Sequence, residues 1–130
     1  MQQPILIIDA DKGHCAELRS ILEEHQYTIL CPDSIVKLET LIERTGCHVL
    51  ILDLDTLPVD NRVLRDLKRK NPKLSIIGLS ARSFHPELKE AMTGYIYACL
   101  CRPVDPDELI YWIRTIHENA SSLEHHSAKD

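Results

Sequence analysis

Residues Val49–Pro58 read VLILDLDTLP, an apolar run that ends on a carboxylate and carries a second carboxylate two residues later. An unbroken apolar run bounded by a polar residue is typical of a strand that is buried on both faces. Ile5–Ile8 and Ser75–Leu79 show the same pattern, and Tyr27–Leu30 and Ala98–Cys101 are weaker examples. The sequence therefore predicts five strands, of which three lie in the interior of a sheet.

The segments between these strands have the apolar spacing of helices. The last of them places Leu109, Ile113 and Ile116 on one face. Helices that alternate with doubly buried strands predict a parallel sheet covered on both sides, with right-handed connections, so the fold class is α/β. We expect one domain over residues 1–119, and a flexible C-terminal tail over residues 120–130, which lack an apolar period.

Composition excludes several classes of function. The chain has 130 residues and a net charge of -5, so it has no general excess of the basic residues that nucleic-acid binding requires. It contains no apolar run long enough to cross a bilayer, and its N-terminal sequence MQQPILIID lacks the features of a secretory signal. We expect a cytoplasmic protein that binds neither nucleic acid nor membrane, with its five cysteines reduced.

Polar residues follow the predicted strands, at the edge where ligands bind in open α/β sheets. These residues are Asp9 and Asp11 after the first strand, Asp53 and Asp55 after the third, Ser80 after the fourth and Arg102 after the fifth. Each acid alone is explained as a helix cap, but together the six side chains predict a site.

Crowded carboxylates repel one another, and a divalent cation such as Mg²⁺ relieves that repulsion. A carboxylate beside Mg²⁺ can act as a nucleophile toward a phosphoryl group while nearby cations absorb the developing charge. In this interpretation Ser80 hydrogen-bonds the transferred group and Arg102 pairs with it.

Four motifs in order resemble the receiver domain of bacterial two-component response regulators. They are ILIIDAD, VLILDLDTLP, IIGLSA and LCRPVDPDEL, and the resemblance runs from Pro4 to Ile116. It implies a flavodoxin-like, doubly wound (βα)5 fold with strand order 2-1-3-4-5. It also implies Asp53 as the phosphoryl acceptor, Asp9 as an acid of a Mg²⁺ site and Ser80 as the switch hydroxyl. The implied partner is a sensor histidine kinase or a phosphotransfer protein.

The chain departs from that family pattern at several positions. Ala10 stands where the family has a second acid, which leaves Asp11 and Asp55 as candidates to complete the metal site. Arg102 replaces the family lysine, and Cys99 replaces an aromatic residue whose rotation accompanies activation. These changes predict an atypical receiver with a weaker Mg²⁺ site. They also leave open a pseudo-receiver that binds partners without phosphorylation.

Two further interpretations concern catalysis and assembly. The segment DLDTL, Asp53–Leu57, resembles the start of haloacid-dehalogenase-type phosphohydrolases, but that motif usually lies near the N-terminus and needs later lysine and acidic motifs that do not fit here, so we expect no enzyme. The last helix adds Tyr111 and Trp112 to its buried stripe, and Tyr97 precedes the last strand. This excess of apolar surface favours a homodimer through the fourth helix, fifth strand and fifth helix, an interface that the family resemblance also suggests.

Overall fold

A five-stranded parallel sheet forms the centre of the structure, a computed structural model that describes residues 4–82 and 85–129. Its strands are β1 (Ile5–Ile8), β2 (Ile29–Leu30), β3 (Val49–Asp53), β4 (Ser75–Ser80) and β5 (Ile96–Cys101). They lie in the order β2-β1-β3-β4-β5, and every neighbouring pair is parallel. The predicted fold class and strand order are therefore confirmed.

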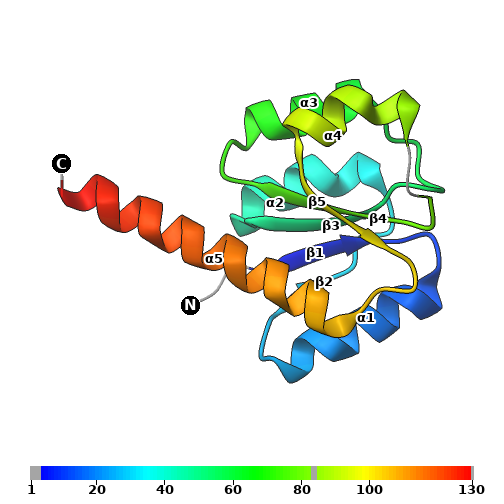
Figure 1. Ribbon diagram of the computed structural model, residues 1–130, viewed down its shortest axis with the longest axis horizontal. Coiled ribbons are helices and arrows are strands. Elements are labelled where there is room, and N and C mark those ends of the chain that lie inside the picture. The colour runs from blue at the N-terminus through cyan, green and yellow to red at the C-terminus, as the bar shows by residue number, and fades with distance from the viewer. Residues whose placement is uncertain (1–3, 83–84, 130) are drawn as a thin grey trace.

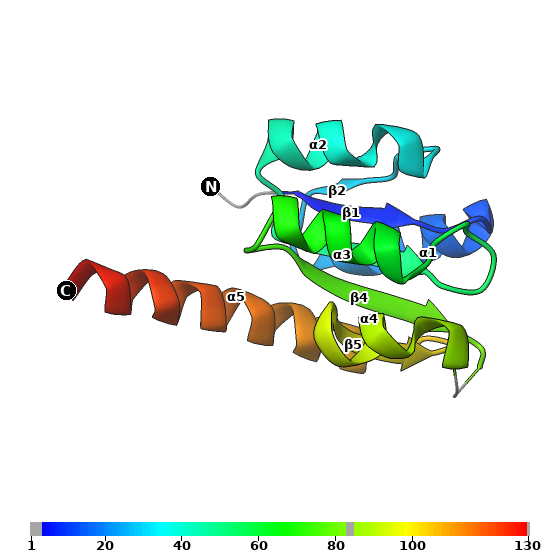
Figure 2. The same ribbon diagram turned by 90° about the horizontal axis from the view of Figure 1, so that it is seen from above.

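Helices cover both faces of this sheet (Figures 1 and 2). They are α1 (Lys12–Glu24), α2 (Leu38–Thr45), α3 (Asn61–Lys70), α4 (Lys89–Gly94) and α5 (Pro106–Lys129), with 3₁₀ turns at Ile35–Lys37 and Pro86–Leu88. Buried residues of α1 and α5 pack on one face of the sheet, and buried residues of α2, α3 and α4 pack on the other. This double cover explains why the central strands read as unbroken apolar runs.

Strand β3 shows how the sequence divides its side chains between the two cores. All five of its residues are buried. Ile51 joins the core beneath α1 and α5, whereas Leu50 and Leu52 join the core beneath α2, α3 and α4. Since Leu52 is in register with Ile8 of β1, the two strands bring Asp53 and the residue after Ile8 to the same edge of the sheet.

Two of the acids near this edge cap helices. Asp11 is the N-cap of α1, where its Oδ1 accepts a hydrogen bond from the backbone N–H of His14 at 3.1 Å. Asp60 is the N-cap of α3 and accepts from the N–H of Val63 at 2.9 Å. These bonds satisfy N–H groups that lack a partner within the helix.

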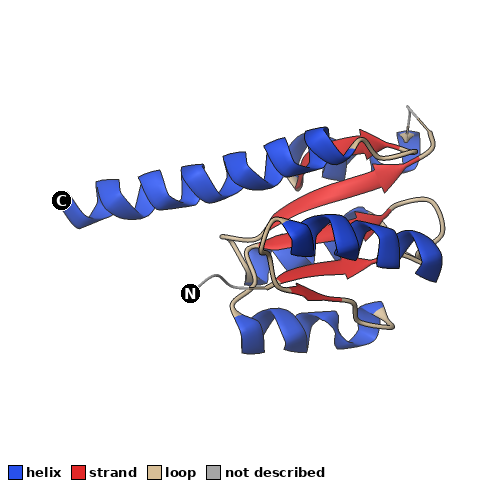
Figure 3. Cartoon of the chain, turned by 90° about the horizontal axis from the view of Figure 1, so that it is seen from below, coloured by secondary structure: helices blue, strands red, loops and turns tan. Residues whose placement is uncertain are grey.

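Helix α5 projects away from the sheet toward the C-terminus (Figure 3). It runs to Lys129 and so extends past residue 119, where the sequence predicts the end of the domain. The flexibility of residues 120–130 stays a prediction. Over the described ranges, 4–82 and 85–129, no helix is both long and apolar enough to cross a membrane.

Candidate functional site

Asp9, Asp53 and Arg102 meet at the carboxyl edge of the sheet, directly at the ends of β1, β3 and β5. Nη1 of Arg102 donates to Oδ2 of Asp9 at 3.2 Å, and Nη2 of Arg102 lies 3.2 Å from Oδ1 of Asp53. The two carboxylate side chains are only 1% and 3% exposed. Burial lowers the pKa of Arg102, but the two negative charges raise it by more, so its pKa lies above the ordinary value. One guanidinium thus bridges two buried acids from separate strands.

The Asp53 carboxylate accepts hydrogen bonds on both oxygens. Oδ1 accepts from the N–H of Asp55 at 3.0 Å, and Oδ2 accepts from the hydroxyl of Thr56 and, at 3.4 Å, from the N–H of Ala10. With Arg102, these donors fill the four acceptor positions that a carboxylate offers. Burial raises the pKa of Asp53, but the hydrogen bonds and the nearby positive charge lower it by more. The group is therefore held ionised at neutral pH.

Ser80 and Asp55 form a second cluster, at the end of β4. The Ser80 hydroxyl donates to Oδ1 of Asp55 at 2.6 Å, and the N–H of Ala81 donates to Oδ2 at 2.8 Å. Nε of Arg82 lies 3.8 Å from the same carboxylate. Burial raises the pKa of Asp55, but the bonds from Ser80 and Ala81 lower it below its ordinary value. The sequence predicts Ser80 beside a group carried by Asp53, whereas in the structure its hydroxyl is bonded to Asp55.

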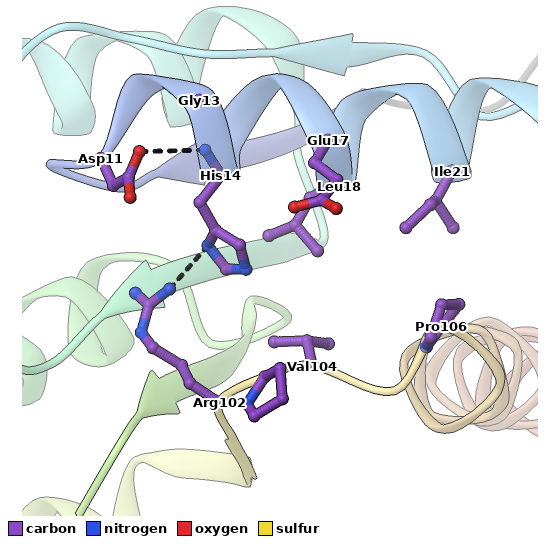
Figure 4. Close-up of a pocket in the computed structure, with 10 residues that line it drawn as sticks. Asp11, Gly13, His14, Glu17, Leu18, Ile21, Arg102, Val104 and Pro106 are labelled. Atoms are coloured by element: carbon purple, nitrogen blue, oxygen red, sulfur yellow. Dashed lines mark hydrogen bonds between the residues drawn. The ribbon is translucent and has the colours of Figure 1, made fainter.

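His14 and Thr56 belong to the site although the sequence analysis did not include them. Nδ1 of His14 lies 2.5 Å from Oδ2 of Asp9 and 2.6 Å from Nη1 of Arg102, the latter contact being drawn in Figure 4. A neutral imidazole can donate to the acid from this atom or accept from the guanidinium, but not both. The spacing of each residue in the sequence is the feature that could have indicated it. His14 lies three residues after the α1 cap, and Thr56 lies three residues after Asp53.

A cavity of about 250 Å³ opens onto these groups. It is lined by Asp9, Asp11, Asp53, Asp55, Thr56 and Arg102. Within the part of the chain that the structure describes, no group of three or more His, Cys, Asp or Glu side chains is arranged to hold a metal ion. In the structure Asp11 caps α1, and Asp55 accepts a hydrogen bond from Ser80. The expected role of these two acids as further metal ligands stays a prediction.

Comparison with known proteins identifies the class of protein that has this fold and these charged residues at the carboxyl edge of its sheet. The sequence matches the family described as the response regulator receiver domain over residues 5–114, and the chain belongs to that family. It is 26% identical over 113 residues to the transcriptional regulatory protein ZraR of Klebsiella oxytoca. That match covers 83% of this chain and 25% of the relative, so the chain corresponds to about a quarter of that protein.

Solved structures agree in fold. The signal receiver domain of an HD domain-containing protein from Pseudomonas fluorescens Pf-5 superposes with a TM-score of 0.81 at 21% identity, covering 96% of this chain and 94% of that one. The beryllofluoride-activated NtrC4 receiver domain dimer gives a TM-score of 0.80 at 19% identity, covering 91% and 98%. The predicted family, two-component signalling class and flavodoxin-like fold are confirmed.

Replacing Thr56 by valine should lower the stability of the domain at neutral pH and remove part of the dependence of this stability on pH. Thr56 is the first of the hydrogen-bond donors that lower the pKa of Asp53, so in Thr56→Val that pKa rises toward its ordinary value. A hydrogen bond to a charged group contributes about 1.5–3 kcal/mol, and we expect the free energy of unfolding at pH 7 to fall by that amount. A depressed carboxylate pKa stabilises the fold above the unfolded pKa of about 3.9, and this contribution disappears as the pH falls through the folded value.

Urea unfolding at a series of pH values measures this effect. The difference between wild type and Thr56→Val should be full at pH 7 and shrink below about pH 4. Thr45→Val is the matched control, because its hydroxyl donates to the backbone carbonyl of Leu41 within α2, and its loss should not vary with pH. A Thr56→Val deficit that stays constant down to low pH would refute the link to Asp53.

Proposed function

We propose that this domain is a phosphorylation-controlled module in which Asp53 accepts a phosphoryl group from a sensor histidine kinase or a phosphotransfer protein. Receiver domains are generally signalling modules rather than enzymes, and they interact with such phosphodonor partners. The observation that carries the proposal is a buried, ionised Asp53 at the end of the central strand, beside Arg102 and facing a cavity of about 250 Å³. A cytoplasmic location also stays a prediction.

The proposed step is the transfer of a phosphoryl group from a phosphohistidine to a carboxylate oxygen of Asp53. The oxygen attacks phosphorus, the P–N bond breaks, and the histidine nitrogen leaves with the electron pair and takes a proton from water. The product is an acyl phosphate. Because all acceptor positions of Asp53 are filled, one donor has to turn away, and the Thr56 hydroxyl is the one that does so by a simple rotation. Arg102 then faces the negative charge of the transferred group.

Receiver domains generally bind Mg²⁺ at their acidic pocket, and the sequence predicts such a site at Asp9 and Asp53. Mg²⁺ prefers near-octahedral oxygen ligands and needs carboxylates with free lone pairs. Here both acids are paired with Arg102, and the neighbouring position is Ala10, which has no ligand atom in its side chain. The residues as arranged do not fit the ion, so the proposed step uses none.

A pseudo-receiver is the second candidate, and one observation favours it. The Ser80 hydroxyl is the donor expected to meet a phosphoryl group on Asp53, yet it is bonded to the carboxylate of Asp55, which also accepts from the neighbouring N–H of Ala81. If the Asp55 carboxylate holds these donors permanently, the surface around them keeps one conformation. A protein partner could then bind this surface without phosphorylation.

Intact mass after incubation with acetyl phosphate tests the proposal against this alternative. Wild type should gain the mass of one phosphoryl group, and hydroxylamine should remove it, since it cleaves acyl phosphates. The adduct should be lost in Asp53→Asn and kept in Asp60→Asn, which changes a carboxylate that caps α3. A wild type that gains no mass would overturn the proposal in favour of the pseudo-receiver.

The proposed assembly is a homodimer through α4, β5 and α5. On this face Tyr97 is 41% exposed and Tyr111 is 59% exposed, and both rings contact Trp112 edge to face, at centroid distances of 5.8 and 5.2 Å. Exposed aromatic clusters of this kind anchor interfaces. A structural neighbour is a receiver domain dimer, which supports the proposal. Cys99 replaces the aromatic residue expected to couple this face to the site, so we expect dimerisation to depend little on phosphorylation.

Analytical ultracentrifugation of wild type and Tyr111→Ala, with and without beryllofluoride, measures this association. Wild type should dimerise in both conditions and Tyr111→Ala should dissociate at concentrations where wild type remains dimeric. Val36→Ala serves as control, because Val36 is 88% exposed on the 3₁₀ turn before α2, away from this face. A wild type that is monomeric at all concentrations removes the dimer, and a dimer that forms only with beryllofluoride removes the weak coupling.

A further inference from the structure

We infer that the guanidinium of Arg102 is the resident cation of this site and holds Asp9 and Asp53 together in place of a divalent metal ion. The inference deepens the proposed function, because it assigns the charge balance around the proposed phosphoryl acceptor. It starts from a mismatch between the family expectation of Mg²⁺ and the contacts at the site.

The position of Arg102 allows it to bridge the two acids. The two acids come from β1 and β3, and Arg102 reaches both with separate nitrogens, each 3.2 Å from a carboxylate oxygen. A planar guanidinium presents its donors as a fork and can serve two carboxylates at once, whereas the compact ammonium of a lysine acts as a point charge. The change from the family lysine to Arg102 therefore supplies a group able to bridge the acids directly.

The guanidinium and a metal ion would compete for the same two carboxylates. Mg²⁺ would need carboxylate oxygens at about 2.1 Å. Arg102 contacts Oδ2 of Asp9 and Oδ1 of Asp53, and the other oxygen of each acid already accepts hydrogen bonds, from the N–H of Asp11 and from Thr56 and Ala10. A divalent ion placed beside the guanidinium would also be repelled by it at short range, where water screens little because both acids are buried. Binding of the metal would thus require Arg102 to move away from the acids, or the other donors to turn away from them.

Neighbouring residues are arranged around this cation. Nδ1 of His14 lies 2.6 Å from Nη1 of Arg102 and 2.5 Å from Oδ2 of Asp9, so His14 contacts this ion pair from the side of α1. Ala10 contributes no third acid, and its N–H instead donates to Asp53 at 3.4 Å. The Asp55 carboxylate is bonded to Ser80 and Ala81. The buried carboxylates of Asp9 and Asp53 thus face the guanidinium of Arg102, a positive charge that belongs to a side chain and not to a bound ion.

Magnesium titration of the full chain tests the inference without reference to phosphorylation. Calorimetry and thermal melts, with NaCl controls at equal ionic strength, would compare wild type with Arg102→Met, which keeps an apolar stem but removes the charge. We expect the melting temperature of wild type to stay unchanged on addition of MgCl₂. Arg102→Met should melt lower, recover stability with MgCl₂, and bind Mg²⁺ about tenfold more tightly than wild type or better, because its two acids are no longer neutralised.

Two further variants keep the test decisive. Arg102→Lys, which retains a charge but not the fork, should bind Mg²⁺ with intermediate affinity if Arg102→Met fails to fold. Arg19→Met is the matched control, since Arg19 pairs with Glu23 on α1 and has no bond to Asp9, Asp53 or Asp55 in the described residues, and it should behave as wild type. Wild type that binds Mg²⁺ as tightly as the Arg102 variants would overturn the inference.

Labelling with acetyl phosphate in EDTA gives an independent readout. The extent of the Asp53 adduct should be the same in EDTA and in MgCl₂, and an adduct that forms only with MgCl₂ would overturn the inference while leaving the proposed function intact. A protein that gains no adduct in either buffer overturns the proposed function, and the magnesium titration then still decides the identity of the cation.

Discussion

Asp55→Ala should bind beryllofluoride about 10- to 100-fold more tightly than wild type, because the Asp55 carboxylate occupies the donors that an anionic group on Asp53 would use. The Ser80 hydroxyl and the Ala81 N–H are bonded to that carboxylate at 2.6 and 2.8 Å. Hydrogen bonds to a charged group contribute about 1.5–3 kcal/mol, which converts to the stated range of affinity. Removing the side chain also removes a negative charge that would repel the ligand.

Fluorine NMR titration measures this affinity through the signal of bound beryllofluoride. The control is Asp60→Ala, which deletes another carboxylate of the same loop but one that caps α3, so its affinity should match wild type while its stability falls by about 1 kcal/mol. Equal affinities of wild type and Asp55→Ala would show that Asp55 does not compete for Ser80 and Ala81. That result would also weaken the case for the pseudo-receiver.

Ile51→Ala should lower the free energy of unfolding by about 3–5 kcal/mol. Ile51 is fully buried in β3, between β1 and β4, and it packs in the core beneath α1 and α5. The truncation removes buried apolar surface and leaves a cavity in the centre of the sheet, where neighbouring strands cannot collapse to fill it. Because Asp53 lies on the same strand, the loss should also loosen the site.

Urea unfolding followed by circular dichroism gives the stability of this variant. Val36→Ala is the control, since Val36 is 88% exposed and its truncation should change the free energy by no more than about 0.5 kcal/mol. A loss for Ile51→Ala as small as that of Val36→Ala would mean that β3 is not packed at the centre of the core.

The sequence predicts the central strands well because burial on both faces leaves an unbroken apolar run, as in β3. The edge strands were predicted less accurately. Strand β2 covers only Ile29–Leu30 rather than Tyr27–Leu30, since it pairs with β1 alone. Strand β5 begins at Ile96 rather than Ala98, and most of its residues are only partly buried or exposed, so its apolar pattern is weaker.

The candidate site was predictable in its residues but not in its pairing. Parallel strands place their carboxyl ends at one edge, which is why Asp9, Asp53 and Arg102 were expected together and are found so. The bond from Ser80 to Asp55 depends on how the loop after β3 turns, and periodicity carries no information about that turn. The contribution of His14 was missed for a related reason, because it depends on the orientation of the first turn of α1.

Borohydride trapping after incubation with acetyl phosphate tests whether Asp53 is the phosphoryl acceptor. The hydride reduces an acyl phosphate to an alcohol with release of phosphate, so a phosphorylated aspartate becomes homoserine and its position can be read by tandem mass spectrometry. We expect homoserine at position 53 alone, in the peptide that carries Asp53 and Asp55, and none in protein kept without acetyl phosphate. Homoserine at position 9 or 55, or none after treatment that fully labels a typical receiver domain, would contradict it.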